Sequence, residues 1–194
     1  MTVTPTDDIY ERYLRKAITE SNQLGDEIAK AAASAYPVIG SGHPLADVML
    51  LKYGPQASEQ QEGVAFFGRT GQAVIKSLER LRVDPLAIYG TNCLKYAGEP
   101  EDEARAFLAR ELHIVGPKLI VVMGEDAVAF LDSLHFPLSY PVEPKPGEIR
   151  QFTPTIQVLA CPDIDASLDE QPAKNAFWNS FKELGRWWSE LPPY

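Results

Sequence analysis

Residues 116–124 read GPKLIVVMG, and this stretch decides the fold. Its centre, residues 119–123, is apolar throughout and largely β-branched, and glycine or proline lies on either side of it. A short apolar run with such boundaries is typical of a strand whose two faces are both buried. The stretch therefore predicts a core strand of a parallel sheet that is covered by helices on both faces.

Other apolar runs extend the same sheet on both sides of this strand. The runs at residues 48–51 and 86–89 are short and apolar, the run at 156–160 is apolar except for Gln157, and an edge strand is expected around residues 148–152. Apolar residues at helical spacing predict helices between and beyond these strands, at residues 8–36, 71–81, 101–115, 126–134 and 172–191. This alternation predicts an α/β domain with a central, mostly parallel sheet of four strands.

The size and composition fit one globular domain. The chain has 194 residues, of which 45% are hydrophobic and 23% charged. We expect a single domain over residues 1–194, with an N-terminal helix at 8–36, a core at 46–168 and a C-terminal helix at 172–191. No apolar run is long enough to span a membrane and the first residues do not resemble a signal peptide, so we expect a cytoplasmic protein with no membrane partner.

The charge bears on possible partners. The formal net charge of −9 counts against a general nucleic-acid binder, because contacts to phosphates require clustered Lys and Arg side chains. A local basic groove remains compatible with this total. In open parallel sheets ligands bind beyond the carboxyl ends of the strands. The segments of interest are therefore residues 52–71, 92–96, 124–127 and 161–167.

Three of these segments carry motifs in the same order as a known family. Residues 48–71 read VMLLKYGPQASEQQEGVAFFGRTG, residues 91–107 read TNCLKYAGEPEDEARAF, and residues 116–131 read GPKLIVVMGEDAVAFL. They resemble family four of the uracil-DNA glycosylase superfamily, in which an apolar strand leads into GEAPG and a PFVGRAG-like segment, followed by TNVVKCRPPNNR and PKVIV motifs. The resemblance covers residues 46–131 and weakens beyond them.

The resemblance implies a three-layer α/β/α fold and an ancestral activity, the N-glycosidic removal of uracil from DNA in base excision repair. It implies that Phe66 stacks on a uracil flipped out of the DNA, and that Asn92 reads the polar edge of that base. Gly54 and Pro55 belong to the same base-binding loop. The resemblance also makes Arg69 and Lys95 candidates for DNA contacts. Two plainer interpretations remain open, because Phe66 could be a core residue and Asn92 a turn residue.

The chain departs from the family at both expected catalytic positions. Tyr53 replaces the acid of GEAPG, and a phenol with a pKa of about 10 is a poor general base at neutral pH. Cys161 replaces a histidine that supports the departing base, and Ser167 replaces an arginine that would meet phosphates. Cys161 could also be imagined as a nucleophile, but no histidine lies near it in the sequence.

The family's cofactor does not match the cysteines of this chain. The resemblance implies an iron–sulfur cluster held by four cysteines, whereas the sequence contains only Cys93 and Cys161. We therefore expect no iron–sulfur cluster, no other metal and no cofactor.

Two functional hypotheses follow from these departures. The first is a uracil-DNA glycosylase-like enzyme with weak or lost excision, which would take single-stranded uracil-containing DNA in preference to duplex. The second is a non-catalytic module that uses the same fold to bind a protein partner, a nucleotide or a free base. The acidic run Asp163, Asp165, Asp169 and Glu170 favours the second hypothesis, because carboxylates in that loop would repel phosphates.

Overall fold

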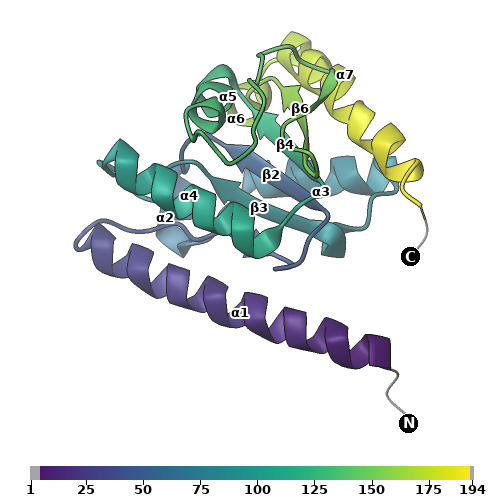
Figure 1. Cartoon of the computed structure of the whole chain (residues 1–194). Helices are drawn as coiled ribbons and strands as arrows, with labels where there is room; N and C mark the ends of the chain where they lie inside the picture. The colour runs from purple at the N-terminus through teal and green to yellow at the C-terminus, as the bar shows by residue number, and fades with distance from the viewer. Residues whose placement is uncertain (1–4, 193–194) are drawn as a thin grey trace.

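The computed structural model describes residues 5–192 and confirms the α/β prediction (Figure 1). Its sheet has six strands in the order β1-β3-β2-β4-β6-β5. The four central strands are parallel to one another, and both edge strands are antiparallel to their neighbours. The strands are β1 (Ser41–Gly42), β2 (Val48–Lys52), β3 (Ile88–Asn92), β4 (Leu119–Met123), β5 (Ile149–Gln151) and β6 (Gln157–Cys161).

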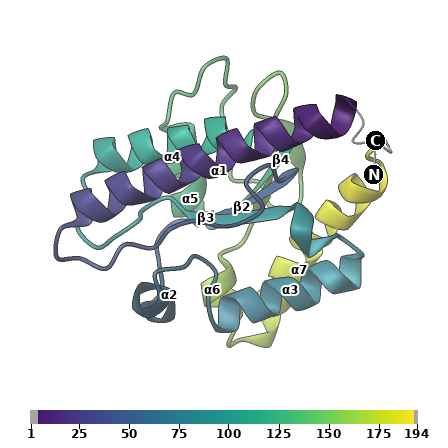
Figure 2. The ribbon, with the colours of Figure 1, turned by 90° about the horizontal axis from the view of Figure 1, so that it is seen from below.

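Helices cover both faces of this sheet. Figure 2 shows α1 and α4 on one side of the strands and α3 and α7 on the other. Two apolar clusters, one on each face, make up most of the core. The helices are α1 (Pro5–Ala32), α2 (Ala57–Glu62), α3 (Arg69–Leu81), the 3-10 turn η1 (Pro85–Ala87), α4 (Glu101–Val115), α5 (Glu125–Asp132), α6 (Ile164–Ser167) and α7 (Gln171–Ser189).

The order of the strands places a switch point at β2. The chain leaves β2 to form β3 on one side of it, and then crosses to form β4 on the other side. The segments that come after these strands therefore diverge at the carboxyl end of β2, which is the place where open α/β sheets bind ligands. Side chains alternate along β2, so Leu50 and Lys52 point to the α3 and α7 face while Met49 and Leu51 point to the α4 face.

Some predicted boundaries were wrong. The N-terminal helix ends at Ala32 and not at residue 36, because Ala33 takes a left-handed conformation with φ of 51°. Helix α2, within the segment 52–70, was not predicted, because its apolar content is too low for a periodic signal. The short edge strand β1 carries no apolar pattern and was missed. The second core strand lies two residues later than expected, since Pro85 begins a 3-10 turn.

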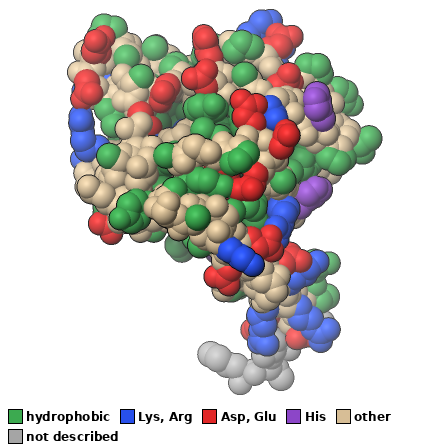
Figure 3. All heavy atoms as spheres, turned by 90° about the vertical axis from the view of Figure 1, so that its left-hand side faces the viewer, with side chains coloured by type: hydrophobic (Ala, Val, Ile, Leu, Met, Phe, Trp, Pro, Cys, Tyr) green, Lys and Arg blue, Asp and Glu red, His purple; other side chains and the backbone are tan. Residues whose placement is uncertain are grey.

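Two surface properties bear on partners. No helix among the described residues is long and apolar enough to cross a membrane. On the face seen in Figure 3, carboxylates are spread over the body of the molecule, whereas Lys and Arg side chains gather toward the narrower end formed by α1. On α1, the side chains of Arg12, Arg15 and Lys16 pair with carboxylates of the same helix.

A buried ion pair lies on the α4 face of the sheet. Lys95 is 0% exposed, and its ammonium pairs with the carboxylate of Glu111 on α4. The same ammonium donates to the Thr91 hydroxyl at 2.7 Å and to the Asn92 carbonyl at 2.7 Å. The Tyr89 hydroxyl donates to Glu111 at 3.0 Å. The pair therefore joins the end of β3 to α4 and holds the backbone of Asn92.

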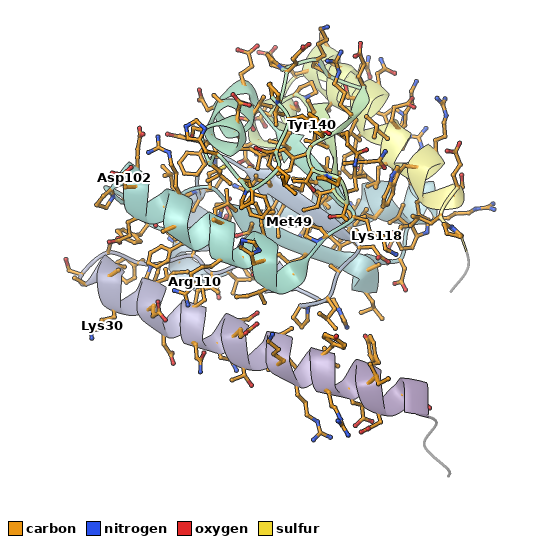
Figure 4. All side chains as sticks on the ribbon, in the orientation of Figure 1. Lys30, Met49, Asp102, Arg110, Lys118 and Tyr140 are labelled. Atoms are coloured by element: carbon orange, nitrogen blue, oxygen red, sulfur yellow. The ribbon has the colours of Figure 1, made fainter. Side chains whose placement is uncertain are left out.

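Removing one partner of this pair should destabilise the fold. For Lys95→Ala we expect a loss of about 3–5 kcal/mol in the free energy of unfolding, because the Glu111 carboxylate stays buried without a cation. Urea denaturation measures this loss. The matched control is Arg110→Ala, whose guanidinium points from α4 toward α1 and pairs with the exposed Glu27 (Figure 4). That pair is open to water, so the midpoint of unfolding should hardly move. Equal losses for the two variants would contradict this account.

Candidate base-binding site

The candidate site lies on the α3 and α7 face, at the carboxyl ends of β2 and β3. Lys52 and Asn92 are the last residues of these strands and are direct neighbours in the parallel register. Phe66 comes after α2 and packs against the apolar cluster of this face. Its ring lies on Gly90, two residues before Asn92 on β3. The structure thus brings Phe66 and Asn92 together on one face, and it adds Lys52 to them.

The Asn92 side chain is buried without a partner. It is 0% exposed, and within residues 5–192 neither its Nδ2 nor its Oδ1 has a hydrogen-bond partner. A buried polar group left in this state costs about 1–3 kcal/mol, and native structures rarely contain one without a reason. A turn residue would bond its side chain to nearby backbone, which Asn92 does not do. The free amide carries one donor group and one acceptor group for a ligand.

Phe66 is held in an unusual conformation by a carboxylate. Its φ is 60°, in the left-handed region that few bulky residues adopt. The Phe66 N–H donates to Oε1 of Glu59 at 2.5 Å, and Glu59 is completely buried. A side chain at Gly90 would place its Cβ 2.7 Å from the Phe66 ring, so the ring can lie on β3 only because residue 90 is glycine. Glu59 and Gly90 together fix the position of the ring.

Lys52 sits over this ring inside a cluster of acceptors. Its Nζ donates to Oε2 of Glu59 at 2.5 Å, to Oδ2 of Asp165 at 2.8 Å and to the Gly54 carbonyl at 3.2 Å. The same Nζ lies 5.8 Å from the centroid of the Phe66 ring. Only 2% of Lys52 is exposed. The ammonium is therefore enclosed by two carboxylates, one carbonyl and one aromatic face.

The acidic run after β6 is less repulsive than its sequence indicates. Asp165 accepts from the Thr70 hydroxyl at 2.5 Å and from the Gln56 amide at 3.1 Å, in addition to Lys52. Asp169 pairs with Arg69 at 2.8 Å, and this guanidinium lowers the pKa of the Asp169 carboxyl. Two of the four carboxylates thus have cationic partners from the segment 52–70. Asp163 accepts from the Asp165 N–H at 2.8 Å and caps α6.

Tyr53 points away from Phe66 and Asn92. It comes directly after Lys52 in the chain, so its side chain turns to the α4 and α5 side, where its ring meets Phe130 edge to face with centroids 6.2 Å apart. Tyr53 is 38% exposed and borders a cavity of about 240 Å³ together with Arg105 and Asp126. The phenol therefore faces solvent and charged side chains.

Cys161 is the last residue of β6 and is buried. Burial raises the pKa of its thiol well above the usual range, because the thiolate would lose its hydration. The thiol therefore stays protonated at neutral pH and supplies neither a nucleophile nor a positive charge. Cys161 borders a cavity of about 320 Å³ beside Gly124 and the loop containing Pro144.

The remaining candidate residues lie in different parts of the structure. Gly54 and Pro55 lie in the loop above Lys52, and the carbonyl of Gly54 accepts from its ammonium. Arg69 begins α3 and is exposed, although Asp169 already pairs with it. Lys95, expected as a candidate for DNA contact, is instead fully buried on the opposite face of the sheet, so we propose no phosphate contact for it. Ser167 is buried in α6 and donates to the Asp163 carbonyl at 2.5 Å.

Comparison with known proteins identifies the family. The model of the uracil DNA glycosylase superfamily matches residues 39–185, which include every side chain of this site. The chain belongs to the uracil-DNA glycosylase superfamily. Among its curated relatives is a type-4 uracil-DNA glycosylase of Archaeoglobus fulgidus, 24% identical over 159 residues that cover 76% of this chain and 80% of the relative. Another is the type-4 uracil-DNA glycosylase of Sulfurisphaera tokodaii, 30% identical over 105 residues, which are 50% of this chain and 48% of the relative.

The iron–sulfur cluster implied by family four does not fit the residues of this superfamily member. Cys93 belongs to the apolar cluster on the α4 face and Cys161 to the cluster on the α3 and α7 face, so the two thiols lie on opposite faces of the sheet. Both are buried, and burial raises both thiol pKa values. Across residues 5–192 no group of three or more His, Cys, Asp or Glu side chains is arranged to hold a metal.

The sequence alone did not reveal the role of Lys52. In the sequence, Lys52 is only the residue before Tyr53, and Asp165 is one acid of a run of four. One signal was available: Lys52 ends an otherwise apolar strand whose residues are buried on both faces. A lysine in such a position needs a carboxylate partner, and Glu59 lies seven residues further on.

The contact between Gly90 and Phe66 can be tested directly. In Gly90→Ala the new Cβ would lie 2.7 Å from the ring, so Phe66 must move. We expect a loss of about 1–3 kcal/mol in the free energy of unfolding, typical of overpacking, together with changed NMR signals of the Phe66 ring. Gly54→Ala is the control, because its Cβ would meet nothing within 4 Å. If Gly90→Ala is as stable as Gly54→Ala and leaves the ring signals unchanged, Phe66 does not pack as described.

Proposed function

We propose that this chain recognises a pyrimidine base flipped out of DNA, with Phe66 as the stacking surface and Asn92 as the reader of the base edge. We further propose that it excises uracil slowly or not at all. Two curated relatives are named as uracil-DNA glycosylases, and their names support a glycosylase-like function for this chain.

The single observation that carries the proposal is the unpartnered amide of Asn92. Uracil presents one N–H donor between two carbonyl acceptors along its polar edge. A side-chain amide offers both a donor and an acceptor and can match such an edge. Because the Asn92 amide lies beside the Phe66 ring on a buried face, a stacked base would bring its edge within reach and satisfy the amide. The cost of leaving this amide unpaired is then offset by base binding.

Slow excision is supported by the two substituted positions. Cleavage of the glycosidic bond needs a group that positions water and a group that stabilises the departing base anion. Tyr53 and Cys161 occupy the positions at which the family resemblance implies those groups. The phenol points toward Phe130, and the buried thiol is uncharged. Neither side chain supplies the missing acid, base or positive charge.

A single strand is the substrate that the charge distribution favours. Arg69, an exposed candidate for a phosphate contact near the site, already pairs with Asp169. The net charge of −9 opposes close approach of a duplex, whose phosphates are dense on both strands. A base in a single strand is also cheaper to extrude, because no base pair has to be broken.

A second candidate function is a non-catalytic binding module. The inert environments of Tyr53 and Cys161 favour it, because recognition of a base needs only Phe66 and Asn92. In that case the ligand would be a nucleotide, a free base or a protein partner. Detectable excision that Asn92→Ala abolishes favours the first candidate, and ligand binding without any excision favours the second.

The test is a cleavage assay with uracil-containing oligonucleotides, single-stranded and duplex, at low salt. We expect excision slower than that of an ordinary type-4 enzyme by about a thousandfold or more, since each missing group typically costs ~10²–10⁴. Any residual cleavage and any preference for uracil should disappear in Asn92→Ala. The control is Asn175→Ala, which changes an exposed amide on α7 that bonds to Gln171. Rapid excision that survives Asn92→Ala would contradict the proposal.

A further inference from the structure

Lys52 occupies the space over Phe66 in which a stacked base would lie. We propose that Lys52 is the gate of this site: its ammonium, held by Glu59 and Asp165, excludes a base until the contact with Asp165 breaks. The proposal rests on the base site proposed above. It assigns a gating role to a residue that neither stacks on the base nor reads it.

The hydrogen bonds of the Lys52 ammonium keep the site closed to a base. An ammonium has three N–H donors, and those of Lys52 are directed to Glu59, Asp165 and the Gly54 carbonyl. No donor is left for a ligand. A stacked base lies about 3.5 Å from an aromatic ring, in the range of van der Waals contact. The Lys52 Nζ, over the ring at 5.8 Å from its centroid, leaves too little room for the base and its substituents.

The burial of Asn92 supports the same conclusion. Among residues 5–192 its amide has no hydrogen-bond partner, and it is buried from solvent, although a reader of bases must be reached by its ligand. Lys52 is its neighbour in the register of β2 and β3 and lies on the same face. Movement of Lys52 would therefore uncover Asn92 and Phe66 together.

Of the two carboxylates that hold Lys52, Glu59 is fixed in place, whereas the contact with Asp165 can break. Glu59 is completely buried and also holds two backbone N–H groups, those of Gln56 at 2.6 Å and Phe66 at 2.5 Å. Asp165 lies on the four-residue helix α6, and 15% of its side chain is exposed. When Lys52 leaves, Asp165 keeps the Thr70 hydroxyl and the Gln56 amide as donors. Opening is therefore cheaper on the Asp165 side than on the Glu59 side.

The charge of the cluster decides which ligands it disfavours. One ammonium and two carboxylates give the cluster a net charge of −1. A base anion formed on Phe66 would lie against this negative charge as long as Asp165 stays in place. The cluster therefore does not stabilise the departure of a base as an anion.

The experiment measures hydrogen exchange of the Asn92 side-chain amide by NMR. In Lys52→Ala and in Asp165→Ala we expect the exchange rate to rise about tenfold or more, because local opening sets this rate. Asp165→Ala leaves the Lys52–Glu59 pair intact, so this variant tests the gate even if Lys52→Ala does not fold. The matched controls are Lys76→Ala, an exposed lysine on α3, and Asp169→Ala, an exposed acid near Asp165. Both controls should exchange as slowly as the unmodified chain.

A titration with free uracil, monitored through the same Asn92 signals, gives the second readout. We expect saturable shifts in the two gate variants and at least about tenfold weaker binding in the unmodified chain. Unchanged exchange in both gate variants would overturn the gate. Weaker uracil binding in Lys52→Ala than in the unmodified chain would overturn it too, since Lys52 would then be a contact to the base. Faster exchange without any uracil binding would instead uphold the gate and refute the base site.

Discussion

The carboxylate of Glu59 is the group on which the rest of this site depends. One of its oxygens accepts the N–H of Phe66, and the other accepts the N–H of Gln56 and the ammonium of Lys52. Because the carboxylate is completely buried, it requires the positive charge of Lys52. The same group therefore sets the conformation of the loop before α2, the left-handed conformation of Phe66 and the position of the lysine above its ring.

This constraint links two segments that lie far apart in the sequence. Asp165, which lies after β6, accepts a hydrogen bond from the Lys52 ammonium that Glu59 also holds. It accepts a second one from the hydroxyl of Thr70 at the start of α3. The segments after β2 and β6 are thereby joined by one buried cluster at the carboxyl ends of the strands. On the opposite face Lys95 and Glu111 join β3 to α4 in the same manner. The Lys52 cluster borders the proposed base site directly, and the Lys95–Glu111 pair holds the backbone of Asn92 from the opposite face of the sheet. Tyr53 and Cys161 take part in neither ion pair.

Most of the fold could be predicted from the sequence. The strand 119–123 and the helices 101–115 and 71–81 carry uninterrupted apolar patterns, and burial on both faces of the sheet enforces such patterns. Strand β1 and helix α2 could not be predicted, because two polar residues and a helix with the sequence ASEQQE carry no periodic signal. The partners of Lys52 could not be predicted either. Asp165 lies 113 residues from Lys52, and only the folded sheet brings them together. Lys95 was misplaced for a similar reason, since a lysine in a motif does not reveal whether it faces solvent or a buried Glu111.

The central claim is that the free amide of Asn92 and the ring of Phe66 form a site for a base. A crystal structure of the Asp165→Ala variant grown with uracil tests this claim most directly. We expect the base to stack on the Phe66 ring with its polar edge hydrogen-bonded to both amide atoms of Asn92, and the Lys52 ammonium to be displaced from the ring. A structure in which the Asn92 amide is bonded to other protein groups, with uracil absent or bound elsewhere, would contradict it.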